Sequence, residues 1–126
     1  MENLSTVLVI EDDMFIQNMV ETTLLEGGFR VALSSSGEKA IDLLNTQQPP
    51  FCAIVSDINL GKSTLTGWDV AKRAREIDPE IAVIYMTGHG EDDWASHGVP
   101  KSVLVVKPFV PLQIVTALVN LLNQQS

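Results

Sequence analysis

The stretch FCAIVSDINL, residues 51–60, decides the fold class of this chain. It contains an unbroken apolar run that ends, after Ser56, at a single aspartate, Asp57. Successive side chains of a strand point to opposite faces of a sheet, so a continuous apolar run indicates a strand that is covered on both faces. Four more short apolar runs, rich in β-branched residues, lie at residues 7–10, 31–33, 81–86 and 103–106. The sequence therefore predicts a buried sheet of five strands.

Between these runs, apolar residues recur with helical spacing. A strand followed by a helix, five times over, requires crossover connections between parallel strands. We therefore predict an α/β fold of the (βα)5 type. Its doubly wound, five-stranded parallel sheet would have the strand order 2-1-3-4-5, which is the flavodoxin-like order. The predicted helices cover residues 14–26, 37–45, 67–77 and 110–124, with room for about two further helical turns at residues 91–100.

Length and composition indicate a small, acidic, globular protein. Its 126 residues correspond to one domain, 1–126, and a hydrophobic content of 45% is too high for a disordered chain. The net charge of −8 argues against nucleic acid as a partner, because a phosphate backbone binds to basic surfaces. The single cysteine excludes an internal disulfide. With neither a basic signal-peptide start nor a run of about 20 apolar residues, we expect a soluble, cytoplasmic protein without a membrane partner.

Polar residues follow four of the apolar runs, at the point where each predicted strand ends. The carboxyl ends of parallel strands lie at one edge of the sheet, where open α/β folds bind ligands. Strands one and three are neighbours in the predicted order, about 4.8 Å apart. We therefore expect these polar side chains to gather. They are Glu11, Asp12 and Asp13 after the first run, Asp57 after the third, Thr87 after the fourth, and Lys107 and Pro108 after the fifth.

The expected cluster of Asp12, Asp13 and Asp57 carries more negative charge than Lys107 balances. Two carboxylates about 4 Å apart repel by about 4 kcal/mol at an effective dielectric constant of about 20, so that either their pKa values rise or a cation binds. Mg²⁺ suits such a site, because it binds one or two carboxylates together with phosphate. A phosphoryl group would then fit beside Lys107 and the Thr87 hydroxyl, with Asp57 as the nucleophile.

Four motifs at the ends of predicted strands together resemble the receiver domain of bacterial two-component response regulators, and the resemblance covers nearly the whole chain. It implies a (βα)5 fold and a signalling switch rather than an enzyme. The implied phosphoryl donor is a sensor histidine kinase or a phosphotransfer protein, and the implied output is altered binding to a downstream protein. The motifs are Asp12-Asp13, Asp57, Thr87 and Lys107-Pro108.

The resemblance also implies a role for each of these residues. Asp57 is the implied phosphoacceptor, and Thr87 and Lys107 would bind the phosphoryl oxygens. The bond between Lys107 and Pro108 would be a cis peptide bond, a conformation found almost only before proline. The implied Mg²⁺ ligands are Asp12, Asp13, Asp57 and the backbone carbonyl of Asn59.

The chain departs from the family pattern at three places. Leu104 stands three residues before the lysine, where the family commonly has a Tyr or Phe that rotates on activation. The loop at residues 59–66 is longer than usual, and the predicted fourth helix is short. Each departure concerns signal output rather than phosphoryl chemistry.

The same residues also permit different readings on sequence grounds. Asp12 and Asp13 could simply cap the first helix, where acidic residues are favourable. A phosphatase of the haloacid dehalogenase type also uses a strand-end aspartate, but it needs a second aspartate two residues later, and residue 59 is Asn. A phosphorylation-silent interaction module and a receiver fragment of a hybrid kinase would each carry the same motifs.

The predicted last helix has an apolar arc of about 180°, wider than the ~100° that a surface helix needs to face its core. No residue from 110 to 126 is charged. We hypothesise that part of this helix contacts a partner protein or a second copy of the chain, forming a homodimer. The competing explanation is a deep groove that buries the additional arc. Since the chain ends one helix after Pro108, we expect no output domain.

Overall fold

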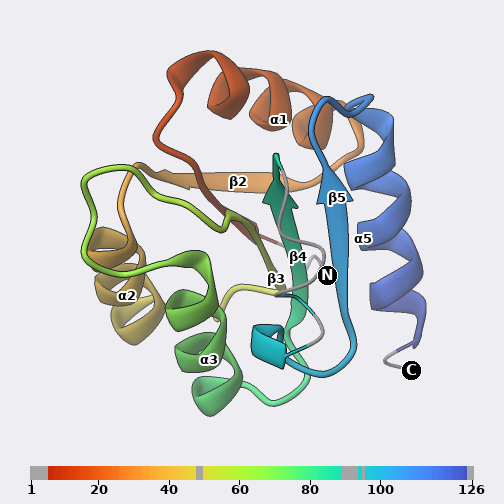
Figure 1. Cartoon of the computed structure of the whole chain (residues 1–126). Coiled ribbons are helices and arrows are strands. Elements are labelled where there is room, and N and C mark those ends of the chain that lie inside the picture. Colours follow the sequence, from red (N-terminus) through yellow and green to blue (C-terminus); the bar gives the residue numbers. More distant parts are fainter. Residues whose placement is uncertain (1–5, 48–49, 89–93, 95, 125–126) are drawn as a thin grey trace.

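The computed structural model describes residues 6–47, 50–88, 94 and 96–124, and Figure 1 shows their arrangement. A five-stranded, fully parallel sheet has the order β2-β1-β3-β4-β5. The fold class and the strand order predicted from the sequence are confirmed. Along the chain, the elements are β1 (Thr6–Ile10), α1 (Met14–Glu26), β2 (Arg30–Ser34), α2 (Gly37–Thr46), β3 (Ala53–Asp57), α3 (Gly67–Ile77), β4 (Ala82–Thr87), β5 (Ser102–Val106) and α5 (Leu112–Gln124).

The short helix predicted at residues 91–100 falls largely on residues 89–93 and 95, which lie outside the described part of the chain. Residues 94, 96 and 97 have helical conformation. The Trp94 indole donates a hydrogen bond to the Ser102 hydroxyl at 2.9 Å, and the Val99 amide donates one to the Tyr85 hydroxyl at 3.1 Å. The end of this segment is therefore attached to both β4 and β5.

Two pairs of helices cover the sheet, α1 and α5 on one face and α2 and α3 on the other (Figure 1). Alternate residues of β1 contribute to both cores. Val7 and Val9 pack towards α1 and α5, and Leu8 and Ile10 pack towards α2 and α3. Every residue of β3 and β4 is buried. This burial on both faces explains why the strands read as continuous apolar runs.

Side chains cap the starts of both α2 and α3. Ser36 Oγ accepts a hydrogen bond from the Lys39 amide at 3.2 Å, and Thr66 and Asp69 form a capping box. Gly67 opens α3, and a Cβ at this position would overlap the carbonyl oxygen of Asp57. Because only glycine allows this approach, α3 begins directly against the strand end that carries Asp57.

Helix α5 buries part of its apolar arc. Ile114, Leu118 and Leu121 face the sheet, while Leu112 and Val119 are exposed. The surface that receives α5 is therefore too shallow to cover the whole arc. None of the described helices is both long enough and apolar enough to cross a membrane.

Candidate functional site

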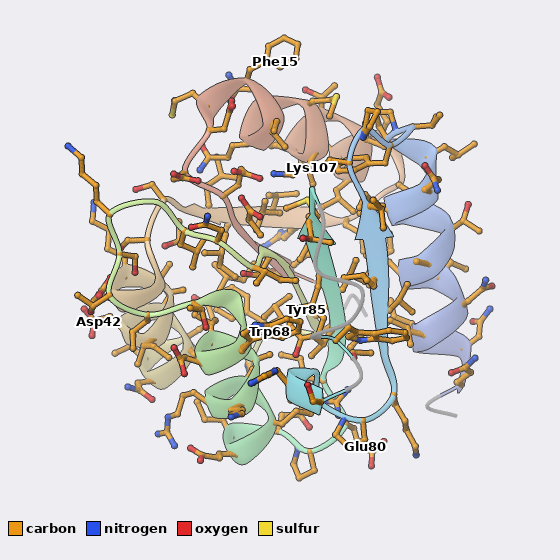
Figure 2. The ribbon with its side chains drawn as sticks, in the orientation of Figure 1. Phe15, Asp42, Trp68, Glu80, Tyr85 and Lys107 are labelled. Atoms are coloured by element: carbon orange, nitrogen blue, oxygen red, sulfur yellow. The ribbon has the colours of Figure 1, made fainter. Side chains whose placement is uncertain are left out.

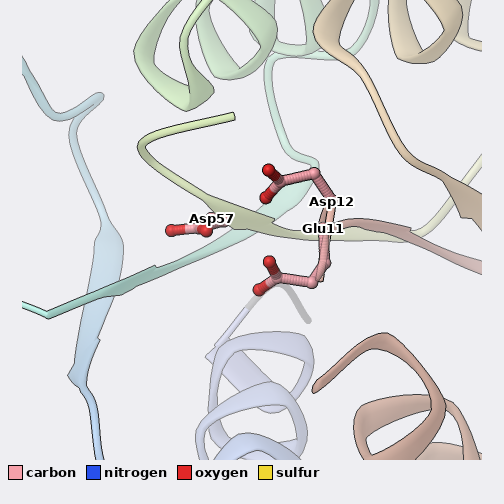
Figure 3. A group of neighbouring side chains, drawn as sticks. All are labelled: Glu11, Asp12 and Asp57. Carbon is pink, nitrogen blue, oxygen red and sulfur yellow. The ribbon is translucent and has the colours of Figure 1, made fainter. Parts of the chain in front are cut away.

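Three carboxylates gather at the carboxyl edge of the sheet. Asp57 is the last residue of β3, and Glu11 and Asp12 directly follow β1, the strand beside it. One oxygen atom from each of these residues lies within 4.8 Å of the other two (Figure 3). Glu11 and Asp57 are buried, and Asp12 is exposed. The strand-end position of Asp57 that the sequence predicted places it in this acidic cluster.

Asp13 lies outside the acidic cluster, so the expectation that it joins Asp12 and Asp57 is wrong. Its carboxylate caps α1, where Oδ1 accepts hydrogen bonds from the amides of Phe15 at 2.9 Å and Ile16 at 3.2 Å. A carboxylate in this position satisfies backbone N–H groups that have no partner within the helix. Glu11 takes the place in the cluster that the sequence analysis gave to Asp13.

Hydrogen bonds fix Glu11 in the cluster. The Asp13 amide donates to Glu11 Oε2 at 3.1 Å, and the buried Gln17 side chain donates to the Glu11 carbonyl at 3.0 Å. The sequence placed Glu11 at this edge of the sheet without a role in the cluster, and it did not indicate Gln17 at all. The signal for Glu11 was its position at a strand end, because it is the first residue after the apolar run of β1.

Lys107 follows β5, which lies on the other side of β4 from Asp57, and its side chain reaches the acidic cluster. Its ammonium donates hydrogen bonds to Asp57 Oδ2 at 3.2 Å and to Glu11 Oε1 at 3.4 Å. The predicted reach of this side chain across to Asp57 is confirmed. The Lys107–Pro108 bond is cis, as expected. The Lys107 amide also donates to the Thr87 carbonyl at 2.6 Å, which joins the ends of β5 and β4.

Burial and charge shift the pKa values of this cluster. Burial raises the pKa of Glu11 to about 7, and burial also raises the pKa of Asp57, against the opposing effect of Lys107. For Lys107, burial favours a lower pKa, but the Asp57 and Glu11 carboxylates outweigh it and raise the pKa. A single ammonium among three carboxylates leaves negative charge uncompensated, so that the cluster favours a further cation.

The donor set fits Mg²⁺. The cluster offers carboxylate oxygens from three residues, close enough for one ion to contact. Hard oxygen ligands are those that Mg²⁺ prefers, and a site with one or two direct carboxylates leaves positions for water and phosphate. The residues that could hold the ion are Glu11, Asp12 and Asp57.

Thr87 and Asn59 lie near the cluster in the fold. Thr87 is the buried last residue of β4, which pairs with β3, and Asp57 is in register with the preceding residue, Met86. Asn59 lies two residues after Asp57 and is exposed, and its side-chain oxygen accepts a hydrogen bond from the Gly61 amide at 3.3 Å. Both residues therefore come from the segments that border the acidic cluster.

Leu104 is half-buried in β5 and is paired in register with Tyr85 of β4. It packs among the side chains between the sheet and the α2–α3 pair. The aromatic rings of this region include Tyr85 and Trp68, whose centroids lie 4.7 Å apart in an edge-on arrangement (Figure 2).

Comparisons with known proteins identify the family. A family model described as the response regulator receiver domain matches residues 7–119. A response regulator receiver protein from Sinorhizobium medicae has a crystal structure with a TM-score of 0.93 and 39% identity, covering 98% of each chain. A receiver domain of the Pseudomonas aeruginosa sensor histidine kinase PA1611, solved with a magnesium ion in its active-site cleft, is 21% identical with a TM-score of 0.79 and covers 96% of this chain and 99% of that one.

Among curated proteins, the transcriptional regulatory protein AfsQ1 of Streptomyces coelicolor is 36% identical over 69% of this chain and 36% of its own length. The response regulator receiver protein CpdR of Brucella abortus is 30% identical over 65% of both chains. This chain thus spans well under half of AfsQ1 and about two thirds of CpdR. The family match, the strand order and the acidic cluster agree, and the chain belongs to the response regulator receiver domain family of two-component signalling systems.

Proposed function

We propose that this protein is a phosphorylation-dependent switch that accepts a phosphoryl group on Asp57, from a histidine kinase or a phosphotransfer protein, and then changes its affinity for a partner protein. Receiver domains act as signalling switches of this kind. The observation that carries the proposal is the position of Asp57, with the Lys107 ammonium 3.2 Å from one of its oxygens and two further carboxylates beside it.

Asp57 is the proposed nucleophile. One of its carboxylate oxygens forms a bond to phosphorus, the bond from phosphorus to the donor's imidazole nitrogen breaks, and the electron pair remains on that nitrogen. Lys107 already contacts Asp57 and would neutralise charge on the transferred group. The Thr87 hydroxyl would donate a hydrogen bond to a phosphoryl oxygen. Hydrolysis of the resulting acyl phosphate returns the carboxylate.

Glu11, Asp12, Asp57 and the backbone carbonyl of Asn59 are the proposed ligands of Mg²⁺. When bound, the ion supplies positive charge for the oxygens of the phosphoryl group. The three carboxylates hold the necessary oxygen atoms close together, and the Glu11 backbone is fixed by Gln17. Asp13 is not among the proposed ligands, because its carboxylate caps α1.

An exposed apolar patch beside the acidic cluster supports a protein as the phosphoryl donor. Met14 and Phe15 begin α1 directly after the acidic residues, and the Phe15 side chain is 77% exposed. Figure 2 shows Phe15 projecting from α1 away from the rest of the protein. A partner that covered this ring would bring its own phosphohistidine towards Asp57.

The face formed by β5 and α5 is the proposed output surface, for a downstream protein or a second copy of the chain. Leu112 and Val119 are exposed on α5, and a groove between α5 and β5 is lined by residues that include Leu104 and Thr116. Val105, which also lines this groove, is in register with Met86, the residue before Thr87 in β4, which gives the phosphorylation site a structural route to this surface.

Incubation with acetyl phosphate and Mg²⁺, followed by intact-mass measurement, tests the proposal. We expect the wild type to gain one phosphate, and Asp57→Asn to gain none. Asp13→Asn is the matched control, since it removes an adjacent carboxylate outside the cluster, and it should be phosphorylated like the wild type. A wild type that gains no phosphate from acetyl phosphate or from a histidine kinase would favour a phosphorylation-silent interaction module.

A further inference from the structure

The segment that follows Asp57 is attached to α2 through the carboxylate of Glu38. We call residues 58–66, which join β3 to α3, the β3–α3 loop. Ser63 Oγ donates a hydrogen bond to Glu38 Oε1 at 2.6 Å. The amide and the hydroxyl of Thr64 both donate to Glu38 Oε2, at 3.0 and 2.5 Å. Figure 1 shows this loop, in yellow-green, bending over towards the start of α2.

The start of α2 and the β3–α3 loop lie in close contact. Ser63 Oγ also accepts hydrogen bonds from the amides of Gly37 at 3.1 Å and Leu65 at 3.2 Å. A Cβ at Gly37 would lie 2.8 Å from the Leu65 Cβ, so glycine is required where the two segments meet. Ser63 therefore serves as both donor and acceptor, which ties the loop to the side chain and to the backbone of α2.

The other side of the same loop contacts the acidic cluster. Gly61 has a positive φ of 61°, and a Cβ there would overlap the Asp12 carboxylate. Its amide donates to the side chain of Asn59, whose carbonyl is a proposed Mg²⁺ ligand. Asp12 and Glu38 line the same groove, together with residues that include Gly61 and Ser63. The position of Gly61 relative to Asp12 thus depends on where Ser63 and Thr64, in the same loop, are attached.

The Glu38 carboxylate is ionised at neutral pH. The hydrogen bond from Ser63, followed by that from Thr64, lowers the pKa of Glu38 to about 2. Hydrogen bonds to an ionised acceptor are shorter and stronger than those between neutral groups. The Glu38 carboxylate is therefore an ionised acceptor for Ser63 and Thr64, and the attachment does not titrate in the neutral range.

We propose that Glu38 is a positioning residue for the phosphorylation site. By holding Ser63 and Thr64, it fixes the β3–α3 loop and thereby the positions of Asn59 and Gly61 relative to Asp12. This inference rests on the proposed function, because it concerns the same Mg²⁺ and phosphoryl site. Glu38 touches neither group. When a residue that orients metal ligands without touching the metal is removed, the metal affinity typically falls by about tenfold or more.

Mg²⁺ titration by calorimetry tests the inference with four variants of the full chain. Glu38→Ala removes all three hydrogen bonds, and we expect Mg²⁺ affinity to fall by about tenfold. Glu38→Gln keeps one acceptor oxygen and should fall between Glu38→Ala and the wild type. Ser63→Ala removes a partner without any change in charge, and it should also weaken binding. Glu26→Ala, at the end of α1 remote from the site, loses the same charge as Glu38→Ala and should bind Mg²⁺ like the wild type.

Hydrogen exchange of the Thr64 and Gly61 amides, measured without metal, provides the second readout. Faster exchange in Glu38→Ala and Ser63→Ala is expected, with the core strands unchanged. A lower unfolding temperature with wild-type Mg²⁺ affinity in folded Glu38→Ala and Ser63→Ala would overturn the inference, since Glu38 would then only stabilise the fold. A wild type that binds no Mg²⁺ would overturn the proposed function itself, and the inference with it.

Discussion

Glu11 and Asp13 show how two neighbouring acidic residues take different roles. Glu11 follows the last residue of β1 and turns into the sheet edge, where burial raises its pKa to about 7. Asp13, two residues later, lies at the start of α1 and binds backbone amides. The hydrogen bond from the Asp13 amide to the Glu11 carboxylate connects the two, so that the helix cap and the acidic cluster share one short turn.

The raised pKa of Glu11 predicts how the stability of the metal-free protein depends on pH. Between the ordinary value of 4.5 and about 7, the native state holds a proton that the unfolded chain has lost. The contribution of Glu11 to the free energy of unfolding is therefore fully present below pH 4.5 and is lost as the pH rises through about 7. Urea unfolding in a chelator should show this decline, and Glu11→Gln should flatten it. Stability that is constant or increases over this range in the wild type would contradict the assignment.

Proton loss from Glu11 also couples Mg²⁺ binding to pH. If Glu11 binds the ion as a carboxylate, Mg²⁺ competes with the proton, and the affinity should increase as the pH rises through about 7. Calorimetric titration at several pH values measures this increase. Asp13→Asn should show the same pH profile as the wild type. An affinity that does not vary with pH would exclude Glu11 as a ligand.

Among the elements, α3 illustrates how the backbone places the site. Gly67 lets the first turn of α3 pack against the carbonyl of Asp57, and its amide donates to the Ile58 carbonyl at 2.8 Å. We expect Gly67→Ala to destabilise the fold by about 1–3 kcal/mol, because the added methyl group overlaps backbone atoms. Urea unfolding measures this effect. Gly27→Ala, where a methyl group meets only ordinary contacts at 3.4 Å, should change stability much less.

Helix α5 gives a second prediction at the scale of elements. Leu121 is only 8% exposed and belongs to the core, whereas Val119 is 41% exposed. Leu121→Glu would therefore disrupt the fold, and Val119→Glu is the appropriate probe of the interface hypothesis. We expect Val119→Glu to fold normally and to weaken self-association measured by sedimentation. Wild-type sedimentation and partner binding in this variant would contradict an interface on α5.

Sequence reasoning performed best where one residue directly follows a buried strand. Asp57 and Lys107 lie at strand ends that the apolar runs define, and both are in the site. It failed at Asp13, because three consecutive acids after a strand do not show which of them point into the site and which one caps the helix. It gave no sign of Gln17 or Glu38, since their roles depend on contacts between segments that are distant in the chain.

For the molecule as a whole, the chemistry is concentrated at one edge of the sheet. The strand order places β1 and β3 side by side, and β4 and β5 next to them. The ends of β1, β3 and β5 supply the acidic cluster and Lys107, and Thr87 ends β4 between them. Two apolar cores, one on each face, hold these strands in register.

Binding of Mg²⁺ to the native state alone should stabilise the whole molecule. At a concentration a hundredfold above the dissociation constant, the expected gain in the free energy of unfolding is about 2.7 kcal/mol. Thermal or urea unfolding with and without the ion measures it. Asp12→Asn should reduce the gain and Asp13→Asn should leave it unchanged. An equal gain in Asp12→Asn and in the wild type would indicate binding elsewhere.

Locating the phosphate tests the central claim most directly. After incubation with acetyl phosphate and Mg²⁺, rapid digestion and tandem mass spectrometry identify the modified residue. We predict a phosphoryl group on Asp57 that depends on Mg²⁺ and is absent when the metal is chelated. Phosphate on Ser63, on Thr64 or on a histidine, with Asp57 unmodified, would contradict the account.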